Sequence, residues 1–394
     1  MKALRTFSQI FWAAGILAMP FTVSLLLRQS TGPGNFNPYT GASLTVSEAF
    51  IGIAMIGAVF FERATKKERG IYAMIMGFAL LAVSFSQNQP SSLFALIPIV
   101  TAMGAVFLIH RKVLPLNTVK RLFVGSMALQ GVIAFAQMLL QQSVGLSILG
   151  EPLIGPEISG VAKWSLAGHT LIRAYGTFPH ANVLAGFALM ALMNLNAVPK
   201  KYRLWVGILV GIGFVLALSK AAFLAGLIAL ILFKKIPKRR GIPALVILAV
   251  TIRLMFPLIL EKEFVQERIQ YIKISAEMAL EHPEGVGLAQ FTDRMQAFTE
   301  FKLQPWQFQP VHNIYLLVLN EDGIWALLFL LIGIKHWWKA GKRTHPMLIA
   351  FLIIGLFDHY LITLPQGLLL IGLIVGLTTV PMTPGPVQNQ GSHA

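Results

Sequence analysis

The chain from Glu261 to Asn313 reads EKEFVQERIQYIKISAEMALEHPEGVGLAQFTDRMQAFTEFKLQPWQFQPVHN and is the only long polar interruption between Val198 and Lys335. Apolar residues in its first part recur at helical spacings, which predicts an amphipathic helix lying on a membrane surface or on a helix bundle. The proline and glycines of HPEGVG then end that helix. We expect this loop to close over a reaction centre at a membrane surface. The apolar positions are Val265, Ile269, Ile272, Ala276 and Ala279.

The composition predicts a polytopic membrane protein. Of 394 residues, 56% are hydrophobic and only 12% are charged, and the mean hydropathy is +0.69. These values lie far outside the range of soluble domains. The absence of cysteine excludes a disulfide framework and a thiolate metal site. The apolar stretch 7–27 is too long for a signal-peptide core and lacks a cleavage pattern, so it is expected to be the first membrane span.

About 12 stretches are long and apolar enough to cross a bilayer, which takes roughly 20 residues. They predict an all-α, single integral-membrane domain over 1–380, followed by a Pro/Gly/Gln-rich, disordered tail over 381–394. Two long segments, 142–180 and 261–312, separate the spans. Two short spans meet at Ser219-Lys220, which predicts a tight hairpin. The predicted spans are 7–27, 44–61, 70–86, 92–109, 122–141, 181–198, 204–218, 220–233, 242–260, 313–334, 346–362 and 366–380.

The distribution of positive charge predicts the orientation in the membrane. A formal net charge of +16 would also suit a protein that binds nucleic acid. However, the basic residues are concentrated in short loops between apolar stretches, as the positive-inside rule requires. We therefore expect the lipid bilayer and not nucleic acid as a partner, with both termini in the cytoplasm and the two long segments outside. The basic loops are 2–5, 63–69, 111–121, 200–203, 234–240 and 335–343.

Three outward-facing cations are candidates for binding phosphate. Arg173 precedes the span 181–198 and offers a fork that matches phosphate oxygens, although it would also serve as an interfacial anchor. Lys220 lies in the hairpin turn, where a lone cation departs from the positive-inside trend. Arg268 lies on the amphipathic loop helix and is either a site residue or one member of a solvated charged face.

His312 is the candidate general base. A neutral histidine is suited to take a proton from an attacking hydroxyl, because its ordinary pKa lies close to neutral pH. The alternative is that Asn313 caps the next span and His312 only sits at the interface. Two ionisable pairs, Glu321-Asp322 and Asp358-His359, fall inside predicted spans, and Glu321 is a candidate partner for a buried cation such as Arg253. No histidine, carboxylate or glycine-rich motif predicts a metal or nucleotide site.

Four motifs in the same order resemble the O-antigen ligase and O-antigen polymerase superfamily. They cover roughly residues 165–335. Ala181 stands where the family has a proline, and Lys220 stands where it has an arginine, which keeps the charge but gives up the bidentate fork. The motifs are Arg173-x-x-Gly176-Thr177-Phe178-x-His180-x-Asn182, Ser219-Lys220, Arg268 through Gly287 to Phe291, and His312-Asn313-x-Tyr315-Leu316 through Glu321-x-Gly323.

The resemblance implies a glycosyltransferase of the GT-C type in the bacterial inner membrane. Such enzymes move a glycan from undecaprenyl diphosphate to an acceptor hydroxyl on the outer face, and we expect an inverting reaction without a metal ion or cofactor. His312 and Arg268 would be catalytic, and Arg173, Lys220 and Arg268 would bind the diphosphate. The supporting residues would be His180, Asn182, Asn313 and Glu321.

Three other functions remain open. Within the superfamily, a ligase uses lipid A-core as the acceptor, a polymerase uses another glycan, and some members glycosylate proteins. The compact length favours a ligase. From another class, a lipid-linked oligosaccharide flippase or other transporter would show repeat symmetry between its halves, which the sequence lacks.

Overall fold

A computed structural model describes residues 1–28, 39, 41–166, 169–232, 262–339 and 345–380. Helices make up most of these residues, and two small hairpins account for the strands. The predicted span 242–260, Arg253 and the tail 381–394 lie outside the described residues. The helices are α1 (Lys2–Ala18), α2 (Val46–Val59), α3 (Lys66–Phe85), α4 (Gln89–Phe94), α5 (Leu96–His110), α6 (Leu116–Leu140), α7 (Ala181–Met193), α8 (Lys200–Leu216), α9 (Lys220–Leu232), α11 (Lys262–Glu281), α12 (Phe291–Arg294), α13 (Ile314–Lys339), α14 (His345–Phe357), α15 (Tyr360–Thr363) and α16 (Pro365–Thr379).

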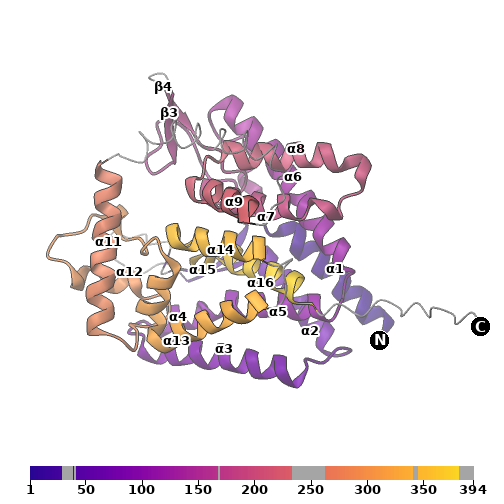
Figure 1. Ribbon diagram of the computed structural model, residues 1–394, viewed down its shortest axis with the longest axis horizontal. Coiled ribbons are helices and arrows are strands. Elements are labelled where there is room, and N and C mark those ends of the chain that lie inside the picture. The colour runs from indigo at the N-terminus through magenta and orange to yellow at the C-terminus, as the bar shows by residue number, and fades with distance from the viewer. Residues whose placement is uncertain (29–38, 40, 167–168, 233–261, 340–344, 381–394) are drawn as a thin grey trace, which may run out of the picture.

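The long helices form a bundle, and one helix lies across its end. In Figure 1 most helices run horizontally, whereas α11 stands upright across their left end. We call this the site end, because α8 ends there and α7, α9 and α13 begin there. The N-terminus lies at the opposite end. The helix α11 thus covers the site end, as expected of a helix that lies over a membrane-spanning bundle.

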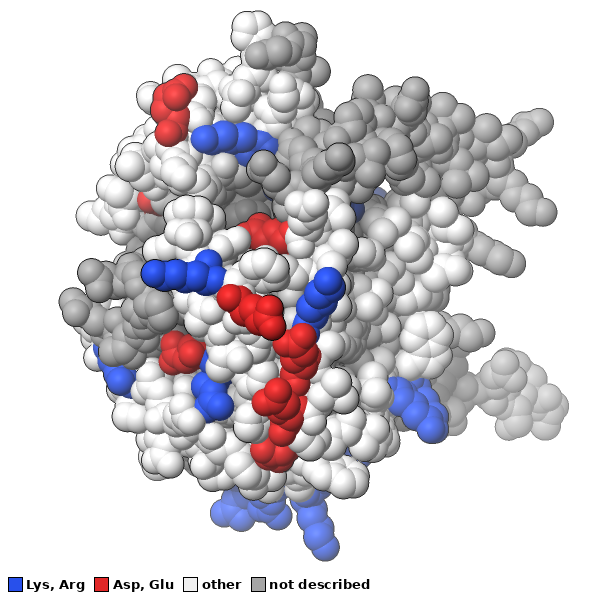
Figure 2. Space-filling model, turned by 90° about the vertical axis from the view of Figure 1, so that its left-hand side faces the viewer, with Lys and Arg blue, Asp and Glu red and all other residues white. Residues whose placement is uncertain are grey.

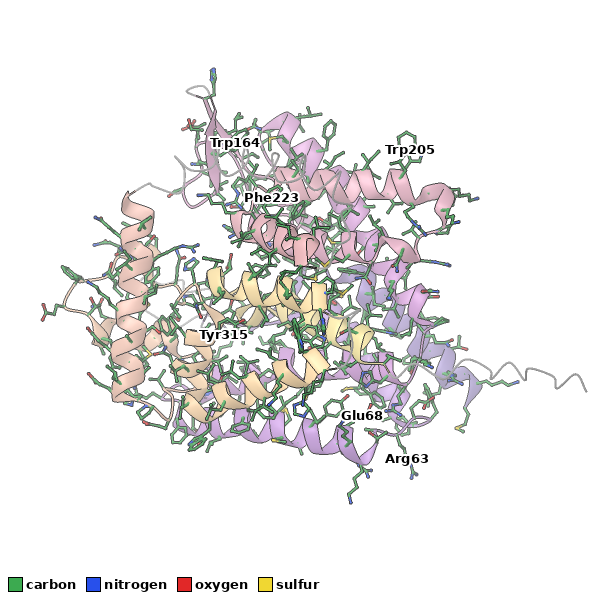
Figure 3. The ribbon with its side chains drawn as sticks, in the orientation of Figure 1. Arg63, Glu68, Trp164, Trp205, Phe223 and Tyr315 are labelled. Atoms are coloured by element: carbon green, nitrogen blue, oxygen red, sulfur yellow. The ribbon has the colours of Figure 1, made fainter. Side chains whose placement is uncertain are left out.

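The outer surface of the bundle is apolar, as the membrane prediction requires. Among the described residues, four helical stretches, 66–85, 89–110, 116–140 and 314–339, are long and apolar enough to cross a membrane. Along α6, Leu129, Val132 and Phe135 are 49%, 47% and 49% exposed. Trp205 on α8 also points away from the bundle (Figure 3). Large apolar side chains exposed in such numbers need lipid around them.

The first helix is shorter than predicted. It ends at Ala18, just before Pro20, which cannot continue a helix. The prediction of a span over 7–27 is therefore wrong in its second half. Strand β1 (Ser24–Arg28) follows and pairs antiparallel with β2 (Ala42–Thr45). A second antiparallel hairpin, of β3 (Lys163–Leu166) and β4 (His169–Ile172), lies in the segment 142–180, and neither hairpin was expected.

Two further features bear on the site. The chain turns between α8, which ends at Leu216, and α9, which begins at Lys220, close to the predicted position. The two helices do not form the predicted tight hairpin, because α8 packs mainly on α6 and α9 packs mainly on α14. The predicted span 346–362 is wrong near its C-terminal end, because α14 ends at Phe357 and α15 begins only at Tyr360. The two residues between these helices are Asp358 and His359, whose side chains compete with continued helix by bonding locally: Asp358 Oδ1 accepts from the backbone N–H of His359 at 2.9 Å.

The packed face of α11 differs from the expected apolar face. Val265, Ile269 and Ile272 are 37%, 47% and 51% exposed. A neighbouring stripe packs against the bundle instead. It consists of Tyr271, Ile274, Ser275 and Met278, all at most 1% exposed.

Candidate functional site

The last two residues of α14 and the two residues that follow it, Leu356–His359, form a turn at the site end that we call the α14–α15 turn. Asp358 is buried in it. The amide nitrogen of Asn182, in the first turn of α7, donates to Asp358 Oδ2 at 2.6 Å. The amide oxygen of Asn182 accepts from Arg173 Nη2. Asn182 thus bridges a buried carboxylate and an arginine from a different segment.

Arg268 and Asn313 reach the same turn from two other segments. Arg268 Nη1 donates to the carbonyl oxygen of Phe357 at 3.1 Å. Asn313 Nδ2 donates to the carbonyl oxygen of Leu356 at 3.4 Å. The Asn313 side chain also accepts the backbone N–H of Leu316 at 3.0 Å, so it caps the start of α13 as well.

His312 lies against His359 of this turn. The two imidazole centroids are 5.0 Å apart in an edge-to-face arrangement. On another side, Tyr271 of α11 stacks on His312 at 6.0 Å with an interplanar angle of 10°. The Nδ1 atom of His312 is buried and has no hydrogen-bond partner among the residues that the structure describes. Buried polar atoms are normally paired, so this imidazole is a position that a ligand could complete.

The surroundings of His312 keep it neutral. Burial lowers the pKa of its imidazole, and nearby His359, Arg268 and His180 lower it further, against an opposing effect of Asp358. A neutral imidazole has a lone pair and can accept a proton at neutral pH. The lowered pKa also makes this imidazole a weaker base than an ordinary histidine.

Arg173 is positioned by two glutamines of α6. Gln137 Oε1 accepts the backbone N–H groups of Tyr175 and Gly176 at 3.0 and 2.8 Å, and Gln130 Oε1 accepts that of Thr177 at 2.8 Å. Gly176 has a φ of +60°, and a Cβ there would lie 2.3 Å from Gln130 Oε1. This turn therefore requires the glycine of the RxxGTF motif. The same turn orients Arg173.

His180 acts locally as a helix cap. Its Nδ1 atom accepts the backbone N–H of Asn182 at 3.1 Å, at the start of α7. Burial and the charge of Arg173 lower the pKa of His180 to about 4. Because a capping Nδ1 must be unprotonated, this low pKa preserves the cap at neutral pH. Ala181 is the first residue of α7, the position that proline favours in helices.

Lys220 lies beside the Arg173 segment, in the α8–α9 turn. It is the first residue of α9 and is half-buried. In the same turn, the carbonyl oxygen of Ala217 accepts from Arg173 Nε at 2.8 Å. Lys220 and Arg173 are therefore connected through the α8–α9 turn, to which Lys220 belongs and which Arg173 contacts.

Glu321 lies apart from the α14–α15 turn and holds the loop after α11. Its Oε1 atom accepts the backbone N–H of Phe291 at 3.1 Å, and its carbonyl accepts that of Gly287 at 3.0 Å. Nearby, α13 is broken at Gly323, which has φ +81° and ψ 177°. The glycines of the two motifs thus lie together: a Cβ on Gly285 would lie 2.7 Å from the nitrogen of Gly323.

Asp358 and His359 are the site residues that the sequence reasoning missed. They were noticed only as a costly ionisable pair in an apolar stretch, and no role was given to them. That cost was the available signal, since charged groups in such stretches normally face a functional interior. The structure adds that the other site residues meet around this pair.

The site end carries charges of both signs. Figure 2 looks onto this end and shows Lys and Arg side chains interspersed with a row of acidic side chains. Glu277, Glu281 and Glu284 of α11 and the following loop are exposed on the protein surface. Among the described residues, no group of three or more His, Asp or Glu is arranged to hold a metal ion.

A scan against protein-family models finds no match, and a search of curated proteins finds no significant relative.

Proposed function

We propose that this protein is a membrane glycosyltransferase that moves a glycan from a polyprenyl (undecaprenyl) diphosphate to an acceptor hydroxyl. The observation that carries the proposal is the meeting of Arg173, Arg268 and His312 around the α14–α15 turn. These residues come from segments far apart in the sequence, and each belongs to a motif of the O-antigen ligase resemblance. Two fixed cations beside a neutral imidazole suit the departure of a diphosphate.

In the proposed reaction, the acceptor oxygen attacks the anomeric carbon on the face opposite the diphosphate, which inverts the configuration. A new C–O bond forms, and the bond from that carbon to the diphosphate oxygen breaks, so its electron pair leaves with the diphosphate. His312 takes the proton of the acceptor hydroxyl. Arg173, Lys220 and Arg268 stabilise the leaving charge. The step uses no metal ion or cofactor.

The remaining site residues act as supports in this proposal. Asn182 and His180 hold Arg173 and the start of α7, and Asn313 ties the start of α13 to the α14–α15 turn. Glu321 holds the loop that follows α11. Their contribution is to keep the cations and the base at fixed separations, because misplacement of reacting groups by about 1 Å can slow a reaction about a hundredfold.

An apolar groove supports a lipid-linked donor. It has a volume of about 370 Å³ and lies between α6 and α8. Leu216, at one end of the groove, is followed by Ala217, whose carbonyl oxygen accepts from Arg173. A prenyl chain lying in this groove would bring its diphosphate to that arginine. The lining residues are Phe135, Ile208, Gly211, Ile212, Val215 and Leu216.

The proposal also covers the cellular location of the protein and its orientation in the membrane. We infer a GT-C type protein of about 12 spans in the bacterial inner membrane, with the site end facing outward and both termini cytoplasmic. Lipid A-core is the proposed acceptor, as in a ligase, and a second glycan is the acceptor if the protein is a polymerase.

The test is a transfer assay with the purified protein in nanodiscs. Undecaprenyl-diphosphate-linked glycan is supplied with lipid A-core or with further lipid-linked glycan. We expect a new glycosidic product from wild type, and a loss of about 100-fold or more in His312→Ala with donor binding retained. His169→Ala, in the exposed β3–β4 hairpin, is the control and should retain activity.

Each outcome of this assay has a defined meaning. Product on lipid A-core supports a ligase, and a lengthened glycan supports a polymerase. Full activity of His312→Ala removes His312 as the base. Donor binding with no product on either acceptor rejects the transferase and favours the transport of lipid-linked oligosaccharides.

A further inference from the structure

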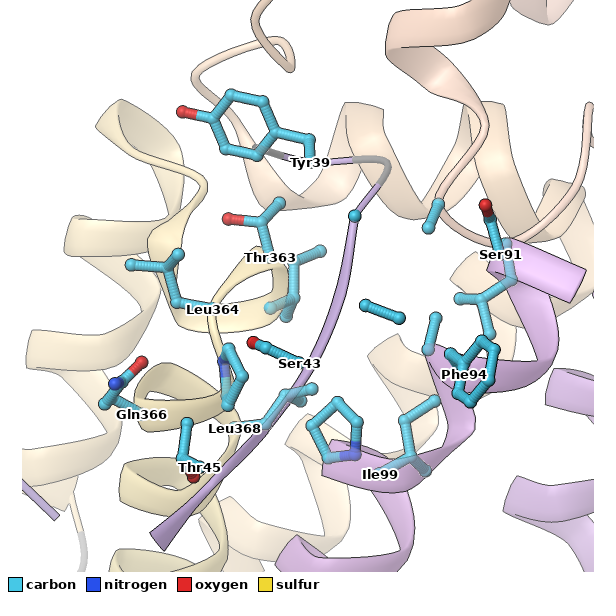
Figure 4. Close-up of a pocket in the computed structure, with 18 of the residues that line it drawn as sticks. Tyr39, Ser43, Thr45, Ser91, Phe94, Ile99, Thr363, Leu364, Gln366 and Leu368 are labelled. Atoms are coloured by element: carbon cyan, nitrogen blue, oxygen red, sulfur yellow. The ribbon is translucent and has the colours of Figure 1, made fainter. Parts of the chain in front are cut away.

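A cavity of about 290 Å³ lies beside the α14–α15 turn and contains none of the three candidate cations. Strand β2 and Tyr39 contribute one part of its wall, and α4 and α5 contribute another. Further parts come from the segment from α15 into α16, from α12 and the residues before it, and from Glu321 of α13. Figure 4 shows Thr363, Leu364 and Gln366 on one side of this space and Ser91, Phe94 and Ile99 on the other.

The chemistry of the lining suits an uncharged, hydroxyl-rich ring. The lining residues include no Lys or Arg, so the cavity offers no fixed positive charge to a phosphate. Hydroxyl and amide groups both donate and accept hydrogen bonds, as a sugar hydroxyl requires. Apolar side chains provide flat surfaces between them. The polar lining residues include Tyr39, Ser43, Ser91, Thr292, Glu321, Thr363 and Gln366, and the large apolar ones include Phe94, Ile99 and Leu368.

One hydroxyl in the lining has no partner. Thr292 is 2% exposed, and its Oγ1 atom has no hydrogen-bond partner within the described part of the chain. Burying a hydroxyl without a partner is unfavourable. A ligand hydroxyl that reached this oxygen from the cavity would remove that cost.

The cavity is connected to the proposed base through one residue. Thr363 lines the cavity, and its Oγ1 atom lies 2.8 Å from His359 Nδ1. Tyr39, also in the lining, contacts the His359 ring at 5.4 Å between centroids. His359 in turn contacts His312 at 5.0 Å. His359 thus contacts both the lining of the cavity and the proposed base.

We infer that this cavity is a binding subsite for one uncharged sugar ring of the donor glycan or of the acceptor glycan. The inference rests on the proposed function, because transfer requires both glycans to be held near the base. The volume lies at the lower limit of small-molecule sites, which start at about 300 Å³, and thus fits a single ring better than an oligosaccharide.

The test is saturation-transfer NMR on the whole protein in phospholipid nanodiscs, which avoid the sugar headgroups of many detergents. The probes are the methyl glycosides of glucose, galactose, mannose and N-acetylglucosamine. We expect ring-proton signals from at least one probe in wild type and in His312→Ala. Ser43→Phe, which fills the cavity, should abolish them. Ser84→Phe, on the exposed surface of α3, should leave them unchanged.

Thr292→Val provides a variant that preserves the fold. It removes the unpartnered hydroxyl but keeps the shape, so the thermal stability should be unchanged or higher. Binding of the probe should nevertheless weaken about fivefold, the effect of one neutral hydrogen bond. Unchanged binding in both Ser43→Phe and Thr292→Val, or no signal from any probe in wild type, would overturn the inference.

Transfer kinetics then identify the source of the sugar. In Thr292→Val, a raised KM for the lipid-linked donor assigns the cavity to the donor glycan, and a raised KM for the acceptor assigns it to the acceptor glycan. If neither KM changes, the subsite is rejected. Because the NMR signals require no turnover, probe binding without any transfer would reject the proposed function and leave the sugar subsite standing.

Discussion

At the level of single residues, the ionisation of His312 determines how transfer should depend on pH. Burial lowers the pKa of this imidazole, and His359 and Arg268 lower it further. A lowered pKa keeps the base neutral in mildly acidic solution, below the ordinary histidine value of about 6.5. We therefore expect the transfer rate at saturating donor to stay level as the pH falls from about 7.5 to 6. A pH–rate profile measures this.

Arg268→Gln is the companion variant. Removing a positive neighbour raises the pKa of His312, so the acidic limb of the profile should move to higher pH, in addition to any loss of donor binding. A wild-type limb centred near the ordinary histidine pKa would contradict the assignment of His312 as a buried neutral base. An acidic limb at the same pH in wild type and in Arg268→Gln would show that Arg268 does not influence the pKa of His312.

The bridge through Asn182 makes a second prediction. Its amide oxygen accepts from Arg173, and its amide nitrogen donates to Asp358. Asn182→Asp sets two carboxylates against each other, and Asp358→Asn leaves nearby cations without their counter-charge. Each should lower stability by about 1–3 kcal/mol. The double variant again has one acid and one amide, so its loss of stability should be smaller than the sum of the losses in the two single variants. Thermal unfolding of wild type, both single variants and the double variant measures this difference. Strict additivity would indicate no coupling between the two side chains.

Sequence reasoning selected most of the residues of this site but could not assemble them. The motif residues Arg173, Arg268 and His312 were selected for charge and position in the chain. The turn at 356–359, on which they meet, was predicted to lie inside a span because its neighbours are continuously apolar. Only the three-dimensional arrangement shows that Asp358 is the counter-charge. Periodicity contains no information on such contacts between distant segments.

At the level of elements, the break in α13 fixes the loop that follows α11. Gly323 has a φ of +81°, and a Cβ there would lie 2.3 Å from the carbonyl oxygen of Glu284. Gly323→Ala should therefore lower the free energy of unfolding by about 1–3 kcal/mol or more. Gly333→Ala is the matched control on the same helix, because a Cβ at Gly333 meets nothing within 4 Å. Thermal unfolding in detergent measures both variants.

Proteolysis tests whether the destabilisation is local. If the break holds the loop, Gly323→Ala should speed cleavage between residues 283 and 300 before the rest of the bundle opens. Equal stability and cleavage in Gly323→Ala and Gly333→Ala would show that the positive φ is not needed.

Elements were predictable where the periodicity and hydropathy agreed. The turn between α8 and α9 and the helix α11 were expected and are present. The packed face of α11 was not, because exposed Ile269 is as apolar as buried Ile274 and only tertiary contacts distinguish the two. The end of α1 at Ala18 was missed because Leu25, Leu26 and Leu27 continue the apolar stretch, although Pro20 gave a local signal for the end of the helix.

At the level of the whole molecule, the apolar composition indicated a helical membrane protein, and the described structure agrees with this coarse statement. The two hairpins at the site end escaped prediction because each strand is only four or five residues long. Hydropathy counts apolar stretches but cannot tell a span from a strand that follows a proline. The positive-inside pattern is independent of these details, because it depends only on which loops carry lysine and arginine.

The orientation can be tested directly, because the chain contains no cysteine. Single substitutions therefore create unique sites for a membrane-impermeant maleimide in intact cells of a bacterial host. We expect Lys302→Cys, in the exposed loop at the site end, to be labelled without permeabilisation. Lys67→Cys, at the start of α3, and Lys201→Cys, at the start of α8, should be labelled only after permeabilisation. The unsubstituted protein is the blank. The reverse labelling pattern would show that the α14–α15 turn faces the cytoplasm. A glycan presented on the outer face could not reach His312 there.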